Sequence, residues 1–372
     1  MFNRTCFLHS PMTSIQIFIA GLLLVGSTWA KDVTIVVYAA YGSPHVVYLN
    51  GRVLEKEERK APKKDDSLWR RLRRIASDLE SDEVPSMRLT WKLGETGSTI
   101  RTNKEGLFEV SVEAPEGTLF SRLKAPEVSL ESKDDRYLAE PTSVTPMIMA
   151  RGDLAIISDI DDTVVRTDVT EGMLFFRQFV KNAAQLEPIA GVSTLYRSLN
   201  AKSMPVLYLS GSPVNLFERL RLYLEVHRFP AGPMFLKNLG IRDSDSLFAQ
   251  KTYKLGHLRK LAKRLPDVEF LCFGDSGEKD AEVYTTFRKE YPKRVKGIFI
   301  RRIPSTKKSV PIMKGAYRTE DSFDAARRLV GMGLVSKELA LEIGKEVWGE
   351  NPMPMSLRLD LEEEVLKAKS GE

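Results

Sequence analysis

The chain has 372 residues, and its 56 lysines and arginines against 50 aspartates and glutamates give a formal charge of +6. Hydrophobic residues make up 42% of the chain and charged residues 28%, as in an ordinary soluble protein. This composition excludes collagen, low-complexity disorder and a polytopic membrane protein. The length suggests about two domains, and so small a charge surplus does not indicate nucleic-acid binding.

The first residues have the organisation of an export signal. Arg4 supplies a positive charge, and an apolar run extends over residues 15–26. Thr28 and Ala30 are small residues at the positions expected before a cleavage site. The run is shorter than the roughly 20 residues that a membrane-spanning helix needs. We therefore predict that residues 1–30 are a signal peptide and that the mature protein is exported, periplasmic or secreted, without an integral membrane span. An uncleaved anchor is the alternative.

Cysteine use is sparse. The chain has only Cys6 and Cys272, and Cys6 lies in the predicted signal peptide. The mature chain then holds one thiol and no internal disulfide. Cys272 falls within an apolar run, so we expect it in the core.

Residues 31–150 predict a small β-sandwich domain with one helix. Asn50-Gly51 favours a hairpin turn, because both residues tolerate positive φ. Residues 65–79 have apolar side chains at helical spacing, with the arginines of 70–74 on the other face. That basic face either docks on anionic lipid or is an ordinary solvated surface. The β-branched and aromatic runs that predict strands cover residues 33–38, 45–49, 87–93 and 107–112.

Residues 151–310 predict a doubly wound α/β domain, because short buried strands alternate with amphipathic helices. Ligands of such domains bind at the carboxyl ends of the strands. Residues 311–372 predict a helical C-terminal tail, clearest over 324–330 and 336–348. The strands are expected over 154–157, 206–209, 268–273 and 297–300, and the helices over 172–186, 192–199, 214–226 and 254–265.

Three carboxylates follow the first of these strands. Asp159, Asp161 and Asp162 lie within four positions, where like charges repel and raise one another's pKa unless a cation holds them. A hard divalent ion with oxygen ligands, such as Mg2+, satisfies this requirement. A calcium loop of the EF-hand type is excluded, because Val164 stands where that loop requires glycine.

Another acidic group follows the third strand. Asp275 and Asp280 belong to the segment Gly274-Asp275-Ser276-Gly277-Glu278-Lys279-Asp280. Gly-Asp-Ser-Gly also occurs around the nucleophile of chymotrypsin-like proteases. The α/β context and Glu278, in place of that pattern's second glycine, argue against a protease.

Hydroxyls and a lysine complete the candidate set. Ser210 opens Ser210-Gly211-Ser212-Pro213 after the second strand, where hydroxyls and backbone amides suit a phosphate oxygen. A simple turn before a helix explains the same residues. Lys254 opens a predicted helix, and its spacing alone does not distinguish it from a surface lysine.

Taken in order, these residues resemble the haloacid dehalogenase superfamily of phosphatases. Its D-x-D-x-T signature corresponds to Asp159-Ile160-Asp161-Asp162-Thr163. Its second motif corresponds to Ser210, its third to Lys254 and its fourth to the pair Asp275 and Asp280. The superfamily's fold would make residues 151–310 a haloacid dehalogenase-like catalytic domain.

Longer segments resemble the actin-patch-protein phosphatidate phosphatase family, whose chemistry is similar to that of the lipins. The resemblance covers about residues 33–303 and includes the β-sandwich that precedes the catalytic domain in bacterial members. Val214 is a departure, because fungal relatives tend to have an aromatic there, and it bears on the lipid-facing contacts. The segments are ISDIDDTVVRTDV (157–169), VLYLSGSPVNL (206–216), FPAGP (229–233), FGDSGEKDAEVY (273–284), VVYLNGRVL (46–54) and TNKEGLFEV (102–110).

The resemblance implies a phosphoryl-transfer mechanism. Asp159 would attack phosphorus to form an aspartyl-phosphate, and Asp161 would act as general acid and then general base. Ser210 and Lys254 would hold phosphoryl oxygens. Asp162 would orient metal-bound water or cap the following segment. Mg2+ would be bound by Asp159, the backbone carbonyl of Asp161, Asp275 and, in support, Asp280.

The expected substrate is phosphatidate, contacted through its head group at a membrane surface. Only about 46 residues separate Thr163 from Ser210, which leaves no room for a large cap over the site. An open site suits a lipid head group or a macromolecule. A phosphoprotein or another phosphomonoester is the alternative substrate, and a non-catalytic binding module is the alternative from another functional class. No nucleic-acid partner is expected, and the sequence does not indicate the oligomeric state.

Overall fold

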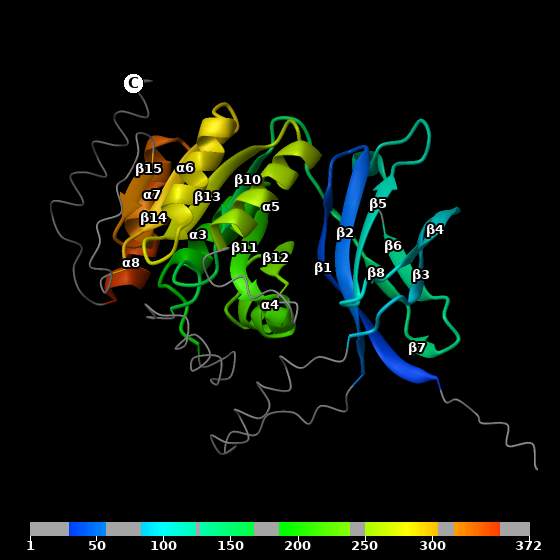
Figure 1. Ribbon diagram of the computed structural model, residues 1–372. Helices are drawn as coiled ribbons and strands as arrows, with labels where there is room; N and C mark the ends of the chain where they lie inside the picture. The colour runs from blue at the N-terminus through cyan, green and yellow to red at the C-terminus, as the bar shows by residue number, and fades with distance from the viewer. Residues whose placement is uncertain are drawn as a thin grey trace, which may run out of the picture.

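The computed structural model describes residues 30–56, 83–123, 127–166, 186–238, 250–303 and 316–349. Over these residues the protein is a mixed α/β structure with a parallel sheet and two further sheets (Figure 1). The predicted signal peptide, apart from Ala30, lies outside the described residues. So do the predicted helix 65–79 and all but the end of the helix predicted over 172–186. No helix in the described part is long and apolar enough to cross a membrane.

The N-terminal half forms two sheets that enclose a hydrophobic core. Buried residues of both sheets, such as Leu49, Trp91 and Val110, belong to one cluster. Exposure alternates along Leu107–Glu113 because successive side chains of a strand point to opposite faces. The predicted strands are confirmed, and those between residues 128 and 148 were not foreseen. One sheet contains β1 (Lys31–Gly42), β2 (Val46–Glu55), β5 (Leu107–Glu113), β7 (Tyr137–Ala139) and β9 (Met147–Ile148), and the other contains β3 (Arg88–Leu93), β4 (Thr96–Arg101), β6 (Val128–Ser132) and β8 (Thr142–Val144).

The hairpin turn predicted at Asn50-Gly51 is wrong. Both residues lie inside β2 and pair with β1 on one side and β5 on the other. A Cβ on Gly51 would come within 2.3 Å of the Phe108 ring and of the Val36 carbonyl oxygen. Gly51 is therefore required by close approach within the sheet, beside a register shift in β1, and not by a turn.

The second half is built on a six-stranded parallel sheet in the order β12-β11-β10-β13-β14-β15. The four predicted strands are confirmed, and the short outer strands β12 and β15 are additional. Because β10 lies between β11 and β13, the carboxyl ends of these three strands meet at the centre of one sheet edge. The strands are β10 (Leu154–Ser158), β11 (Val206–Pro213), β12 (Met234–Lys237), β13 (Glu269–Asp275), β14 (Val295–Arg301) and β15 (Ala316–Thr319).

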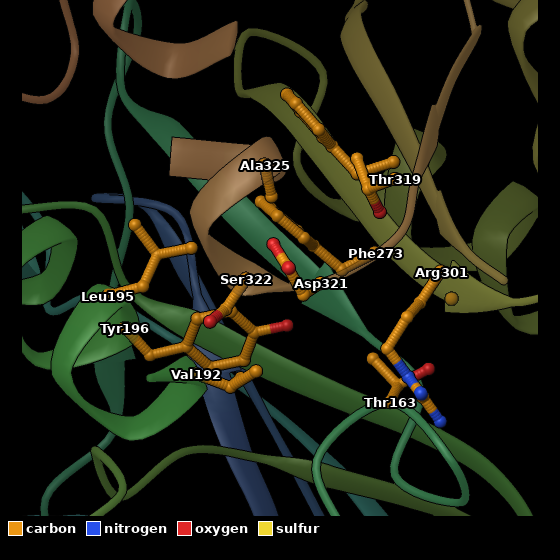
Figure 2. Close-up of a pocket in the computed structure, with 12 residues that line it drawn as sticks. Thr163, Val192, Leu195, Tyr196, Phe273, Arg301, Thr319, Asp321, Ser322 and Ala325 are labelled. Atoms are coloured by element: carbon orange, nitrogen blue, oxygen red, sulfur yellow. The ribbon is translucent and has the colours of Figure 1, made fainter. Parts of the chain in front are cut away.

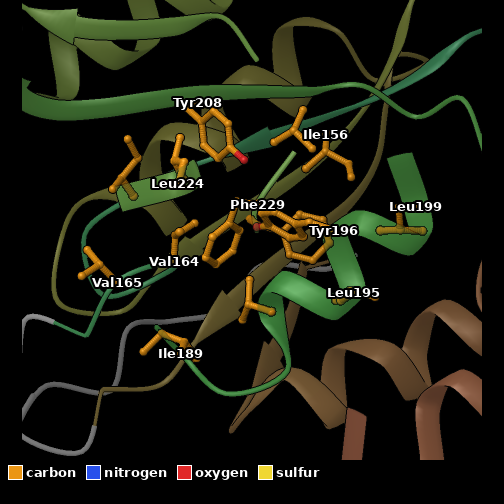
Figure 3. Close-up of a cluster of buried hydrophobic side chains, with 14 of the residues drawn as sticks. Ile156, Val164, Val165, Ile189, Leu195, Tyr196, Leu199, Tyr208, Leu224 and Phe229 are labelled. Carbon is orange, nitrogen blue, oxygen red and sulfur yellow. The ribbon is translucent and has the colours of Figure 1, made fainter. Parts of the chain in front are cut away.

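Helices cover both faces of this sheet. Ile156 of β10 belongs to a cluster with residues of α3 and α4 (Figure 3) and of α7 and α8. The next residue, Ile157, belongs to a cluster with residues of α5 and α6. The sheet is thus buried on both sides, which explains the continuous apolar runs in its strands. The helices are α3 (Val192–Ala201), α4 (Phe217–Val226, after a 3-10 turn at Val214–Leu216), α5 (Gln250–Arg264), α6 (Asp280–Glu290), α7 (Ser322–Gly331) and α8 (Lys337–Trp348).

The sequence predicts a purely helical C-terminal segment, but the structure shows that it also contains a strand. Strand β15 pairs with β14 and extends the parallel sheet, so a boundary at residue 310 divides one sheet. Phe323 of α7 and Ile343 of α8 are buried in the same cluster as Leu195 of α3. A four-residue edge strand with partly exposed side chains leaves little apolar signal in the sequence, which is why the prediction missed it.

The N-terminal sheets pack against the α/β part. Tyr41 of β1 meets Phe235 of β12 edge-to-face, with ring centroids 5.3 Å apart. The guanidinium of Arg264, at the end of α5, donates a 2.9 Å hydrogen bond to the Tyr41 hydroxyl. It also lies 4.0 Å from the centre of the Tyr48 ring and forms an ion pair with Glu109. Arg264 thus joins three side chains of the N-terminal sheets to α5.

Replacing Arg264 by alanine should lower the free energy of unfolding by about 2 kcal/mol, because a charged hydrogen bond and a cation–π contact are lost together. Lys260→Ala is the matched control, since Lys260 also pairs with Glu109 but its side chain is more exposed than that of Arg264. Its loss should stay below about 1 kcal/mol. Urea unfolding of both variants measures the difference, and equal losses would contradict this account of the contact.

Candidate active site

The first loop of the site follows β10 and carries Asp159 and Asp161. The Asp159 amide donates a 2.9 Å hydrogen bond to the Phe273 carbonyl of β13, which continues the sheet pairing by one residue. The chain then turns, and the amides of Val164 and Val165 donate to the Ile160 carbonyl at 2.8 and 3.1 Å. The turn keeps Asp159 and Asp161 at the carboxyl end of the sheet. Asp159 is fully buried and Asp161 nearly so.

Lys254 lies at the centre of the acidic residues. Its Nζ donates hydrogen bonds of 2.9 Å to Asp159 Oδ1, 2.6 Å to Asp280 Oδ1 and 2.8 Å to Glu278 Oε2. Burial alone would lower the pKa of Lys254, but the carboxylates, Asp159 foremost, hold it well above its ordinary value. Lys254 is therefore a buried ammonium. The prediction that Lys254 opens the helix is wrong. It lies one turn inside α5, which already begins at Gln250.

Four carboxylates converge around this ammonium. One oxygen from each of Asp159, Asp275, Glu278 and Asp280 lies within 4.8 Å of the others. The amides of Gly277 and Glu278 donate to Asp275 Oδ1 at 2.6 and 3.1 Å, which fixes that side chain. Four carboxylates and one ammonium leave a surplus of three negative charges when all are ionised.

The outer oxygens of this cluster fit a divalent cation. Oδ2 of Asp159, Asp275 and Asp280 is buried and has no hydrogen-bond partner among the residues that the structure describes. Burial, opposed by Lys254 and reinforced by neighbouring carboxylates, raises the pKa of Asp159 well above its ordinary value. Burial also raises the pKa of Asp275 strongly and that of Asp280 to about 6. Buried anionic oxygens without donors are the ligands that a hard cation prefers.

Gly274 makes the position of Asp280 possible. A Cβ at residue 274 would lie 2.4 Å from Asp280 Oδ2 and 2.8 Å from the ring of Tyr284. These contacts are far too short for any side chain at residue 274. The glycine before Asp275 therefore lets the first turn of α6 approach the end of β13.

Asp161 has different partners from the other carboxylates. Its Oδ2 accepts hydrogen bonds from the hydroxyls of Ser210 at 3.1 Å and Ser212 at 2.9 Å. The Ser212 amide donates in turn to Ser210 Oγ at 2.9 Å. Burial and the charge of Glu278 raise the pKa of Asp161 to about 7, against the lowering effect of the two serines. A carboxyl group with this pKa can both give and take a proton near neutral pH.

The structure brings all six predicted site residues together, and it adds Ser212 and Glu278. Ser210 and Ser212 belong to the irregular end of β11 and not to a separate turn. Their spacing of two could have revealed Ser212, since alternate residues of a strand share a face. Glu278 lies inside the predicted acidic segment but was not assigned a role. The six predicted residues are Asp159, Asp161, Ser210, Lys254, Asp275 and Asp280.

Two further sequence positions have plain structural explanations. Val214 is buried in the core, so it does not face a substrate from solvent. Cys272 is fully buried, which confirms the prediction that it is a core residue.

A small cavity lies beside the site (Figure 2). Its volume of about 30 Å³ can hold a water molecule but not a substrate. Thr163, Gly274, Asp321 and Ser322 are among the residues that line it. The cavity therefore lies between the first loop and the C-terminal segment. None of the four clustered carboxylates lines it, so it is distinct from the carboxylate cluster.

Without a divalent ion, the protein should become less stable as pH rises from about 5 to 8. The carboxyl pKa values are higher in the folded state than in the unfolded state, so their contribution to stability is present at low pH. It is lost as pH rises through about 6 for Asp280 and about 7 for Asp161. Thermal unfolding in EDTA should show a fall in Tm of about 5 °C or more, which Mg2+ reverses at pH 8.

Asp280→Asn provides the control for this pH effect. The variant lacks one of the buried ionisable groups, so its metal-free Tm should decline less over the same pH range. If the Tm of the parent in EDTA stays constant or rises with pH, the buried carboxyl groups do not have the raised pKa values on which this prediction rests.

Comparisons with known proteins give a family match over the segment that contains the site. Residues 154–302 match a family model described as the catalytic domain of phosphatidate phosphatase APP1. This segment contains every site residue from Asp159 to Asp280. The chain is also 34% identical over 161 residues to phosphatidate phosphatase APP1 of Saccharomyces cerevisiae, which covers 42% of this chain and 27% of the yeast protein.

Two other similarities are weaker. An uncharacterized protein of Schizosaccharomyces pombe is 28% identical over 210 residues, which is 55% of this chain and 34% of that protein. The chain thus spans about a third or less of the length of both yeast relatives. A class C acid phosphatase from Bacillus anthracis has 14% identity, with 54% of this chain and 81% of that chain covered. Its TM-score of 0.28 is too low to establish a common fold.

Proposed function

We propose that this chain, which belongs through residues 154–302 to the APP1 phosphatidate phosphatase family, hydrolyses phosphatidate to diacylglycerol and phosphate. The observation that carries the proposal is the convergence of Asp159, Lys254 and the acidic cluster inside the segment that matches the family's catalytic domain. A phosphatase needs a nucleophile, a cation beside it and a proton donor. The described residues can supply each of them.

Asp159 is the proposed nucleophile. A carboxylate oxygen of Asp159 attacks phosphorus and forms an aspartyl-phosphate, and the bond between phosphorus and the ester oxygen breaks. Asp161 gives its proton to the departing alcohol, which leaves as diacylglycerol. Water then attacks the aspartyl-phosphate, Asp161 takes a proton from that water, and phosphate and the Asp159 carboxylate are regenerated.

Other side chains bind and orient the phosphate. Lys254, 2.9 Å from Asp159 Oδ1, is placed to stabilise phosphoryl oxygens next to the nucleophile. Ser210 holds Asp161 in the free protein and can turn its hydroxyl toward a phosphoryl oxygen. Ser212 would retain Asp161 in position while it does so.

Mg2+ is the proposed cofactor. The carboxylates of Asp159, Asp275 and Asp280 would hold it together with the backbone carbonyl of Asp161, and Glu278 is a further candidate ligand. When bound, the ion offsets the repulsion between the Asp159 carboxylate and the anionic phosphate. The buried outer oxygens of the three aspartates support this assignment.

We further propose the finer fold and location. The parallel sheet with helices on both faces supports a haloacid dehalogenase-like doubly wound domain, and the two N-terminal sheets with their shared core support a preceding β-sandwich. Export to the periplasm or the medium follows from the predicted signal peptide. The phospholipid head group would then be met at a membrane surface.

Asp159→Asn should reduce Mg2+-dependent phosphate release by about 1,000-fold or more, because an amide oxygen is a poor nucleophile and a neutral ligand. Phosphate release from phosphatidate in mixed vesicles measures the change. The matched control is Asp267→Asn, an exposed aspartate before β13, which should keep parental activity. Parental rates in Asp159→Asn would show that this residue is not the nucleophile.

Phosphatidate vesicles should be hydrolysed faster than phosphopeptides at equal phosphate concentration. Parallel assays on the parent, with and without Mg2+, measure the preference. A preference for phosphopeptides would replace phosphatidate by a phosphoprotein substrate. If no phosphomonoester is hydrolysed although Mg2+ binds, the non-catalytic binding module becomes the better description.

A further inference from the structure

Arg301 connects the two loops that carry the site carboxylates. It is the last residue of β14, and its Cα pairs with Asp275 of β13. Its Nε donates a 2.6 Å hydrogen bond to the Asp162 carbonyl, and Nη2 lies 3.6 Å from Asp162 Oδ1. Figure 2 shows the Arg301 side chain reaching toward Thr163, on the loop that follows β10. The sequence did not suggest any role for this arginine.

The backbone of the same residue binds the second loop. The Arg301 carbonyl accepts a 2.9 Å hydrogen bond from the Ser276 amide. The Ile303 amide, two residues later, donates to Ser276 Oγ at 2.9 Å. The end of β14 therefore holds the loop of Asp275 by its backbone and the loop of Asp159 by the Arg301 side chain.

The first loop needs such an external contact. Asp162 is buried and has a φ of +50°, in the left-handed region that is sterically unfavourable for residues other than glycine. The loop also brings three carboxylates close together in a buried place. The Arg301 guanidinium interacts with both the backbone carbonyl and the side-chain carboxylate of Asp162. These two contacts favour the left-handed conformation of Asp162.

We propose that Arg301 is a positioning residue for phosphoryl transfer, which fixes Asp159 and Asp161 relative to Asp275 and Asp280. The proposal rests on the proposed function for its reaction. Arg301 acts through Asp162 and does not contact the substrate. Asp162 is then the point at which the loop is held.

Arg301→Met should lower kcat by about 10- to 100-fold and change KM by less than about 3-fold, because the phosphate-binding groups remain while the nucleophile loses its fixed orientation. Arg301→Lys should recover most of the activity, since an ammonium can still donate to the Asp162 carbonyl. Arg302→Ala is the matched control. Its neighbouring guanidinium pairs with the exposed Glu320 and should be dispensable.

Hydrogen exchange supplies a readout that does not depend on activity. In Arg301→Met, amide exchange should increase in residues 159–165, whose loop loses the guanidinium contact to Asp162. It should stay unchanged in residues 275–280, whose loop is held by the backbone of residue 301, and in both loops of the Arg302→Ala protein. Unchanged exchange in residues 159–165 would overturn the proposal whatever the kinetics show. Faster exchange with parental kcat would also overturn it, because Arg301 would then be a structural contact only.

The two proposals fail in different ways. A parent protein without phosphatase activity would reject the proposed function, while the exchange experiment would still decide whether Arg301 links the loops. An active parent with unchanged loop exchange in Arg301→Met would reject only the role of Arg301.

Discussion

The burial of one ammonium among several carboxylates is the constraint on which the rest of the structure depends. Lys254 binds Asp159, Glu278 and Asp280, but one positive charge cannot neutralise four carboxylates in a dry environment. Burial, reinforced by the unneutralised charge, raises the carboxyl pKa values and opposes the fold at neutral pH. An arrangement of this kind persists only where a cation or an anionic substrate with its counter-ion completes it, so the charge imbalance is itself the evidence for a functional site.

Three features of the parallel sheet bring these charged residues together: the strand order, Gly274 and Arg301. Because β10 lies between β11 and β13, residues more than a hundred positions apart in the chain reach the same edge. Gly274 admits Asp280 at a distance that no side chain would permit. Arg301 then ties the two acidic loops to the end of β14. The cluster thus depends on backbone geometry in three neighbouring strands as well as on its own side chains.

Asp159, Ser210 and Asp275 could be placed at strand ends from the sequence because each follows an apolar run, whereas Lys254 was singled out only by the family resemblance. What failed depended on contacts distant in the chain. Asn50-Gly51 has the composition of a turn, yet Gly51 is required by the Phe108 ring and the Val36 carbonyl in neighbouring strands. Strand β15 pairs with β14, but its four residues are too few and too polar to show a strand pattern in the sequence. The partners of Asp162 and Asp161, namely Arg301 and Ser212, are likewise defined by the fold and not by the spacing of the motifs.

The segment that matches the family's catalytic domain is not by itself a complete packing unit. Residues 154–302 exclude α7 and α8, whose buried side chains cover one face of the sheet. They also exclude Tyr41, which covers Phe235 on the other face. In addition, Arg52 of β2 donates a 3.2 Å hydrogen bond to Asn215, just after the serine segment of β11. Because both flanking regions bury apolar surface of the parallel sheet, cutting the chain at the limits of the match would expose its core beside the candidate site residues.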